Sequence, residues 1–154
     1  MKKVFLLVVA SIFSLVCFAK DDVLKINVEQ LPEKAALFIK DYFPESKIKT
    51  IYKSWDEGVA EYKVIFKTKS KIEFDVVGAW SGIEINTKKD KMPRFIYTNE
   101  VNETLDREFY DQIIEKVEND GVYFEFDFKG GSEAKIKRTG EVLSFEKNDW
   151  LFFV

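Results

Sequence analysis

The residues of this sequence that come closest to an acid–base pair are Glu73 and Asp75, two positions apart. Paired carboxyl groups can serve as general acid and general base when burial separates their pKa values. In the segment KIEFDVVG, however, both acids alternate with apolar residues, so they fall on the polar face of an expected strand. Solvated carboxylates are the usual occupants of such a face, and we expect no hydrolase site at this pair.

The residue types that most often catalyse reactions or bind metals are nearly absent. The chain has no histidine, and Cys17 is its one cysteine, which disfavours the usual zinc, haem and cysteine-nucleophile sites. Asp56-Glu57 and Asn119-Asp120 each precede a glycine, as turn residues do, and lack the further oxygen ligands that calcium needs. We therefore expect no catalytic residue, no bound metal and no cofactor.

The first 19 residues have the composition of a secretory signal peptide. A pair of lysines precedes the uncharged apolar run Val4–Phe18, and Ala19 offers a small residue for cleavage. This run is shorter than the roughly 20 residues that span a bilayer as a helix. A lipid anchor at Cys17 is the alternative, although Val16 fits a lipoprotein signal poorly. We expect export to the periplasm, with secretion or lipid anchoring as alternatives.

The mature chain has the size and charge of one small acidic domain. Removal of 19 residues from 154 leaves 135, enough for a single core. The removed segment carries two lysines and no acid, so the formal net charge moves from −3 to −5. This balance argues against a nucleic acid or an anionic membrane as partner. Without a cysteine, packing alone must hold the fold.

Two spacing patterns define the expected elements. In residues 31–43, apolar side chains recur at steps of three and four, which predicts a helix that stops before Pro44. Alternation in residues 61–67 and 71–76 predicts two strands, each with one polar face. Residues 47–55 predict a further, less regular strand.

The second half of the chain has the same pattern as the first. A shift of 62 positions places Phe66 on Phe128 and Gly78 on Gly140, without a gap over the strand region. We therefore predict an α+β fold made by tandem duplication of a helix packed on a four-stranded antiparallel sheet.

The duplication predicts one compact domain with repeats at 20–90 and 91–154. Two segments allow more than one structure. Within 102–118, apolar residues at steps of four favour a helix, whereas the duplication favours a strand at 110–118. The apolar segment 150–154 fits a final strand, a plug against the core, or an exposed partner-binding patch.

The segments LPEKAALFIKDYFP, EYKVIF, IEFDVVGAW and TGEVLSFE resemble the PepSY-like proteins described as β-lactamase-inhibitor-like. The resemblance covers residues 28–147. It implies an exported protein of a Gram-negative bacterium in which a helix packs on a four-stranded antiparallel sheet, twice in tandem. Inhibitors of this architecture grip an enzyme loop with a concave sheet face. The resemblance thus implies a non-catalytic protein- or peptide-binding module, with inhibition of a protease or hydrolase as one form.

Three aromatic residues are the candidate partner contacts. Trp55 precedes an expected turn, Trp80 follows a glycine, and Tyr52 lies on the same expected strand as Trp55. Exposed tryptophans often anchor protein interfaces, although packing at the core or a sheet edge is the more frequent fate of such residues. The expected partner is an envelope or extracellular protein or peptide. The alternative function is a periplasmic carrier of a small apolar ligand.

Overall fold

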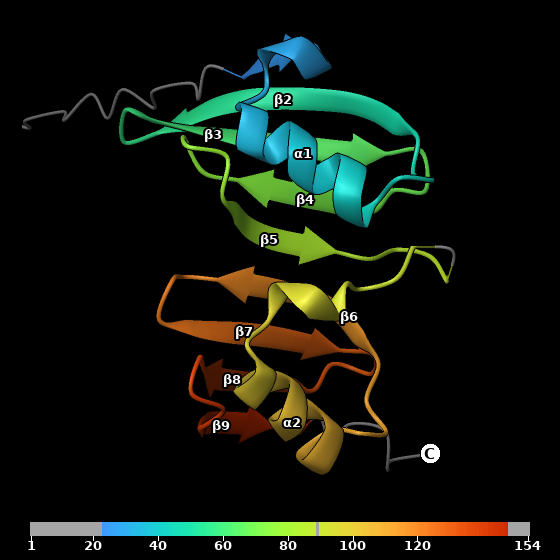
Figure 1. Cartoon of the computed structure of the whole chain (residues 1–154), viewed down its shortest axis with the longest axis vertical. Coiled ribbons are helices and arrows are strands. Elements are labelled where there is room, and N and C mark those ends of the chain that lie inside the picture. Colours follow the sequence, from blue (N-terminus) through green and yellow to red (C-terminus); the bar gives the residue numbers. More distant parts are fainter. Residues whose placement is uncertain (1–22, 89, 148–154) are drawn as a thin grey trace, which may run out of the picture.

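The computed structural model describes residues 23–88 and 90–147. The expected signal peptide, the alternative anchor at Cys17 and the apolar segment 150–154 lie outside the described residues. Nine strands form one antiparallel sheet, paired in chain order (Figure 1). The strands are β1 (Leu24–Ile26), β2 (Ile48–Asp56), β3 (Val59–Phe66), β4 (Lys71–Phe74), β5 (Trp80–Glu84), β6 (Ile114–Asn119), β7 (Tyr123–Phe128), β8 (Glu133–Lys137) and β9 (Val142–Glu146).

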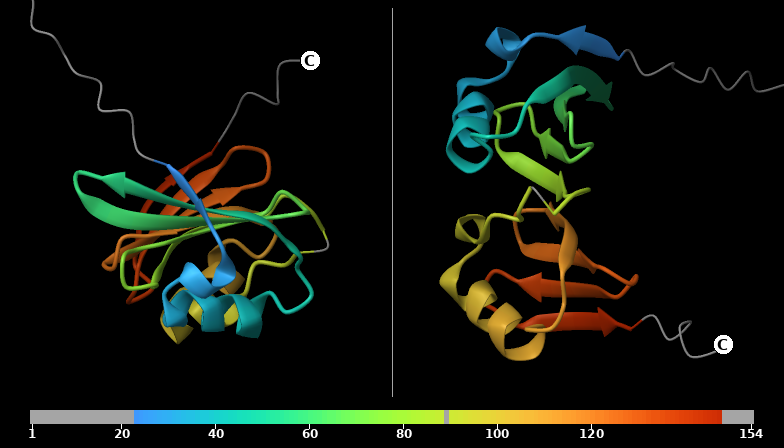
Figure 2. Two further views of the ribbon diagram at one scale, coloured as in Figure 1. Left: turned by 90° about the horizontal axis from the view of Figure 1, so that it is seen from above. Right: turned by 90° about the vertical axis from the view of Figure 1, so that its right-hand side faces the viewer.

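Two short α-helices cover the same face of this sheet and leave the other face open (Figure 2). They are α1 (Glu33–Tyr42) and α2 (Asn99–Glu108), and the 3-10 turns η1 (Val28–Gln30) and η2 (Arg94–Ile96) precede them. In the described part of the chain, no helix has the length and hydropathy needed to cross a membrane.

The segment 102–118 contains both of the structures that its sequence allows. The Thr98 side chain caps α2 by accepting a hydrogen bond from the Val101 backbone N–H at 3.3 Å. The helix ends at Glu108, and β6 starts at Ile114. The first part of the segment is therefore helical and the last part is a strand.

The predicted fold class is wrong, because the structure is mainly β and its sheet is undivided. β5 pairs with β6 in register, with Ile83 opposite Val117. Both side chains are buried on the helix-covered face, so this pairing continues the core. It also satisfies backbone donors and acceptors that two free edges would expose. One nine-stranded sheet thus replaces the predicted α+β duplication of a helix on four strands.

One aromatic core runs under both helices. Five phenylalanines of β3, β4 and β7 are fully or almost fully buried: Phe66, Phe74, Phe124, Phe126 and Phe128. The first residue after each helix joins them, since Phe43 stacks on Phe66 at 5.5 Å and Phe109 on Phe128 at 5.3 Å between ring centroids. The core therefore occupies one side of the sheet and fixes the opposite side as solvent-facing.

Candidate functional site

The face that the helices leave uncovered, here called the open face, carries aligned rows of mostly polar side chains. Residues opposite one another on paired antiparallel strands point to the same face of a sheet. A central row crosses all nine strands: Lys25, Tyr52, Lys63, Glu73, Gly82, Glu118, Glu125, Lys135 and Ser144. A second row runs from β2 to β9: Thr50, Ile65, Lys71, Glu84, Lys116, Asp127, Glu133 and Glu146.

Ion pairs between neighbouring strands position the charges of the open face. Lys63 Nζ lies 2.7 Å from Glu73 Oε1, and Lys71 Nζ lies 2.8 Å from Glu84 Oε2. These four side chains remain between 34% and 48% exposed, so each pair adds only about 0–1 kcal/mol to folding stability. The pairs therefore matter more for where the charges lie than for holding the sheet together.

Carboxylates gather on the part of the open face formed by β6, β7 and β8. The register places Glu118 opposite Glu125 and Asp127 opposite Glu133, and we call these four residues the acidic half. Like charges directly opposite each other destabilise an antiparallel pair. The Lys116 ammonium lies among them, bonded to Glu118 and 3.9 Å from Asp127 Oδ2. The acidic half thus keeps unfavourable neighbours that folding alone does not require.

The pKa values of Lys116 and Asp127 reflect the excess of negative charge in the acidic half. The bond to Glu118 raises the pKa of the Lys116 ammonium above its ordinary value, although burial opposes this. Burial raises the pKa of the Asp127 carboxyl, and the negative charges of Glu118 and Glu125 add to the increase while Lys116 opposes it. A second ammonium, Lys135 of β8, lies 3.5 Å from Glu125 Oε2. Lys116 and Lys135 are therefore two ammonium groups beside four carboxylates, and negative charge remains in excess.

The pKa of the Glu84 carboxyl, next to the acidic half, is lowered, in contrast to that of Asp127. Burial by itself would raise the pKa of the Glu84 carboxyl, but hydrogen bonds from Lys71 and Asn86 lower it overall. The charge of Lys116, which lies opposite Glu84 across the β5–β6 pair, lowers it further. The surroundings of Glu84 therefore stabilise its charged form, whereas the surroundings of Asp127 disfavour the charged form.

The structure does not bring the three predicted partner contacts together. Tyr52 lies on the open face, in the central row. Trp55 lies on the helix-covered face opposite Ala60, where the Lys53 ammonium is 5.0 Å from the centroid of its ring. Trp80 also lies on the helix-covered face, where its half-buried ring stacks on Phe124 at 5.9 Å between ring centroids.

The acid pair considered from the sequence does not form a site. Glu73 lies on the open face, bonded to Lys63. Asp75 follows the end of β4, and its Oδ1 accepts hydrogen bonds from the Val77 and Ala79 backbone N–H groups at 3.0 and 2.8 Å. It is therefore a turn-forming residue. Among the described residues, no group of three or more acidic, histidine or cysteine side chains could hold a metal ion.

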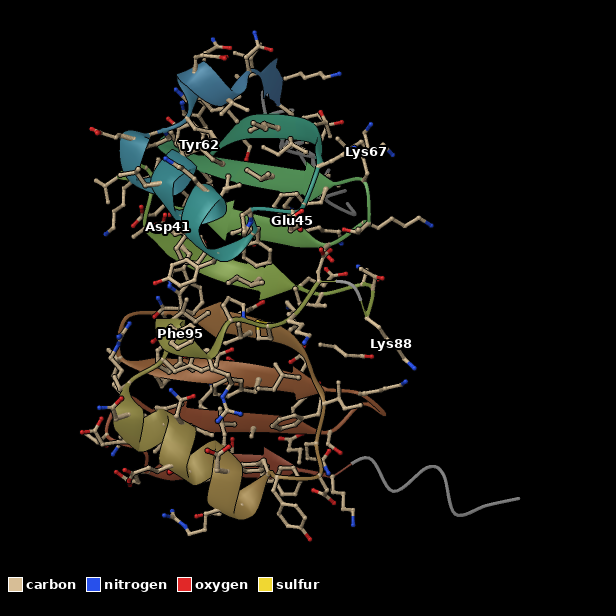
Figure 3. The ribbon with its side chains drawn as sticks, turned by 45° about the vertical axis from the view of Figure 1, so that its right-hand side comes forward. Asp41, Glu45, Tyr62, Lys67, Lys88 and Phe95 are labelled. Atoms are coloured by element: carbon tan, nitrogen blue, oxygen red, sulfur yellow. The ribbon has the colours of Figure 1, made fainter. Side chains whose placement is uncertain are left out.

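An apolar feature that the sequence analysis missed lies on the helix side. Phe95 of η2 is 86% exposed, on the side of the molecule that carries α1 and α2 (Figure 3). Two half-buried aromatic residues of α1, Phe38 and Tyr42, pack against the core on the same side. The Phe95 ring is therefore an alternative candidate for a partner contact, and an experiment must distinguish binding at this ring from binding at the open face.

The acidic half was also missed, although part of its signal is local. In the segment YFEFDF, Glu125 and Asp127 alternate with buried phenylalanines, so their common face could be predicted. The approach of Glu118 and Glu133 depends on the pairing of β6 and β8 with β7, and alternation gives no information on that register.

The fold and the open face define a class of small domain with one antiparallel sheet, helices on one side only and, among the described residues, no cluster that could hold a metal ion. Comparison with known families then identifies the chain. It belongs to the PepSY-like family, described as putative beta-lactamase-inhibitor-like, whose model matches residues 60–144. The resemblance inferred from the sequence is therefore confirmed.

Solved structures from Bacteroides share the fold. A putative periplasmic protein of the DUF2874 family from Bacteroides vulgatus is 28% identical with a TM-score of 0.75, over 83% of this chain and 99% of that one. A putative calcium-regulated periplasmic protein from Bacteroides thetaiotaomicron is 26% identical with a TM-score of 0.74, over 82% and 98%. Another putative periplasmic protein from Bacteroides vulgatus, of unknown function, is 21% identical with a TM-score of 0.72, over 82% of this chain and 99% of that one, and shows the shared fold alone.

These comparisons support export to the periplasm, as expected from the sequence. No curated protein matches the chain. The family is inhibitor-like by description, and no comparison attributes a catalytic activity to a relative.

Proposed function

We propose that this protein is a non-catalytic periplasmic binding module whose open face binds an envelope protein or peptide with basic side chains. The observation that carries the proposal is the acidic half, where carboxylates face each other across the β6–β7 and β7–β8 pairs. A partner that places lysine or arginine side chains between them would relieve the repulsion. Charge complementarity of this kind favours specificity and fast association.

The other half of the open face supplies different contacts. Tyr52 and Ile65 lie there, with Lys63 and Lys71 beside them. An aromatic and an aliphatic side chain provide the apolar area that interface anchors need. The face is therefore polarised, with mixed charge and apolar groups on β2–β4 and excess negative charge on β6–β8. A partner must match both halves to bind well.

Inhibition of a protease or hydrolase is the specific form of binding that the family description suggests. An inhibitor needs a surface broad enough to cover an enzyme loop, and a sheet of nine strands offers one continuous face. This part of the proposal rests on family analogy, and fold alone does not establish an inhibitory activity. Its test is inhibition of the enzyme that is captured on the open face.

The binding proposal can be tested by crosslinked capture from native envelopes with the tagged mature protein. Reversal of two charges in Glu118→Lys/Glu125→Lys should reduce capture at least about tenfold, which corresponds to about 1.4 kcal/mol of binding free energy. Glu103→Lys/Asp111→Lys makes the same change in net charge at exposed positions outside the open face and should leave capture unchanged.

A third variant separates the open face from the helix side. Phe95→Ser removes the exposed ring of η2 without a change in charge. Capture that survives the open-face reversal but is lost in Phe95→Ser would show that the partner binds the helix side, and the proposal would be wrong. Equal losses in both double-charge variants would mean that net charge alone attracts the partner.

The carrier alternative finds less support. A cleft of about 830 Å³ lies beside the β5–η2 connection, but its lining includes Lys116, Asp127, Arg94 and Lys129. Pockets for apolar ligands are lined mainly by apolar side chains. A carrier would release a co-purified small molecule in native mass spectrometry, and detection of one would favour this function.

A further inference from the structure

Two adjoining clefts lie at one end of the sheet. The first, of about 470 Å³, lies where the segment after α1 meets the turn after β3. The second, of about 830 Å³, lies beside the β5–η2 connection. Asp90 and Lys91 of this connection line both clefts, so the two share a wall and form one surface, which we call the paired clefts.

Hydrogen bonds hold the wall between the clefts in place. The Asp90 side chain is almost fully buried, and its carboxylate accepts hydrogen bonds from the Thr68 hydroxyl and from Ser46 Oγ, the latter at 2.7 Å. The Asn86 backbone N–H donates a hydrogen bond to Ser70 Oγ at 3.0 Å. The connection is therefore anchored to the turn after β3 and to the segment after α1, and the charge of Asp90 is bonded within the fold.

Positive charge lines the paired clefts. Their lining includes five exposed lysines: Lys47, Lys67, Lys88, Lys91 and Lys129. Within residues 23–88 and 90–147, no ion pair includes any of these five. Figure 3 shows Lys67 and Lys88 on the same side of the molecule, with their side chains pointing outward. These ammonium groups are therefore available to an anionic ligand.

The carboxylates of the lining do not balance these lysines. Glu45 and Glu115 are exposed and, in the part of the chain that the structure describes, belong to no ion pair. The remaining charged residues of the second cleft belong to ion pairs of this chain: Glu84, Arg94, Lys116 and Asp127. Five ammonium groups therefore accompany two unpaired carboxylates, although the net charge of the whole chain is negative.

Apolar side chains form much of the remaining lining. Tyr42 and Pro44 line the first cleft. Met92 and Ile113 line the second, and Ile113 is 61% exposed. A ligand that matches both features carries negative charges next to apolar groups, since binding sites combine apolar area with a few placed polar contacts.

We propose that the paired clefts bind a peptide segment that carries both acidic and apolar side chains. The acidic side chains pair with the lysines, and the apolar ones cover Tyr42, Met92 and Ile113. This site lies beside the open face and takes a ligand of the opposite charge. It therefore does not depend on the function proposed for the acidic half.

The charge distribution favours a short acidic segment over an anionic membrane. Asp127 belongs both to the acidic half and to the lining of the second cleft, so the positive and negative regions are neighbours. At physiological ionic strength, charges more than about 8 Å apart are largely screened from each other. A short segment within the clefts interacts mainly with the lysines, whereas an extended anionic surface would also approach the acidic half.

Fluorescence anisotropy with the mature protein tests the proposal. The probe is a short peptide of alternating glutamate and leucine that carries a neutral fluorophore. Lys67→Gln/Lys129→Gln removes one ammonium from each cleft and should weaken binding about threefold or more, as expected for the loss of two exposed ion pairs. Added salt should weaken binding to the unchanged protein.

Two further variants locate the binding site. Lys34→Gln/Lys40→Gln makes the same change in net charge at exposed positions of α1 outside both clefts, and it should leave the affinity unchanged. Glu118→Lys/Glu125→Lys on the open face should bind the peptide at least as tightly as the unchanged protein. A loss of binding in the open-face variant would overturn the assignment to the clefts.

Three other results would also overturn the proposal. Equal losses in the two lysine variants would mean that net charge alone attracts the peptide. Equal affinity for a peptide of alternating lysine and leucine would mean that the lysines of the clefts do not select the ligand. Binding to phosphatidylglycerol vesicles without binding of the glutamate peptide would identify the basic surface as a membrane contact.

Discussion

Gly140→Ala should destabilise the protein clearly more than Gly58→Ala. Both glycines have φ +83°, a left-handed conformation that costs other residues roughly 1–2 kcal/mol. Gly58 lies in the β2–β3 turn, and a Cβ added there would meet no atom within 4 Å. Gly58→Ala therefore measures the backbone cost by itself and is the matched control.

The surroundings of Gly140 add a steric cost. A Cβ at this position would lie 2.7 Å from the Glu100 carbonyl oxygen and 2.9 Å from Thr104 Oγ1, both in α2. Thr104 cannot turn away without loss of the hydrogen bond that its hydroxyl donates to the Gly140 carbonyl at 2.7 Å. Overpacking costs about 1–3 kcal/mol, so Gly140→Ala should lose roughly 2–5 kcal/mol in total.

Urea-induced unfolding of the mature protein and both alanine variants measures the difference. Gly140→Ala should lower the transition midpoint more than Gly58→Ala, with the dependence on urea unchanged in both variants. Equal destabilisation of the two variants would refute the close packing of α2 against the turn between β8 and β9. A changed urea dependence would instead mean that the variant alters the unfolded or partly folded state.

Two further predictions concern side chains already described. Trp80→Ala should lower the free energy of unfolding by roughly 2 kcal/mol or more, which is less than for a fully buried tryptophan because the ring is half-buried. Tyr52→Ala on the open face should change the free energy of unfolding by under about 1 kcal/mol. Chemical unfolding measures both changes. Asp127→Asn should slightly stabilise the fold at pH 7, by less than about 1 kcal/mol, because the folded state raises the pKa of this carboxyl and so disfavours its charged form. This advantage should shrink as the pH falls and should vanish below the ordinary Asp value of 3.8, where the carboxyl becomes protonated in both states. An advantage that grows at low pH would contradict the assignment.

Local side-chain patterns predicted much of the structure near each strand. Alternation in the segment around Val64 and Phe66 correctly assigned their side chains to the core, and the same holds for Ile72 and Phe74. The helix at residues 31–43 was predicted from apolar spacing and ends near Tyr42. These features depend on neighbours in the chain, so a single sequence contains the information.

The pairing of β5 with β6 could not be predicted in the same way. Ile83 and Val117 are 34 positions apart in the sequence, and nothing in either strand specifies the other as its partner. The acidic half depends on the same kind of information, because Glu118 and Glu125 approach only when β6 and β7 pair in register. Predictions from periodicity therefore assigned faces correctly within β3 and β4, but wrongly extended the second strand to Val76, which is exposed beyond the end of β4. They also failed for contacts between strands.

Trp80 connects the stability of the sheet to the geometry of the open face. β5 and β6 pair through three residue pairs, against eight for β2 and β3. The β5–β6 junction, here called the seam, is therefore held by few backbone hydrogen bonds. On the helix side, the Trp80 ring lies almost parallel to Phe124, at 6°, and also stacks on Phe38 of α1. A partner that contacts both Lys63 and Glu125 needs this seam to keep its shape. Trp80→Ala should therefore weaken binding together with stability, whereas the charge reversal at Glu118 and Glu125 should weaken binding alone.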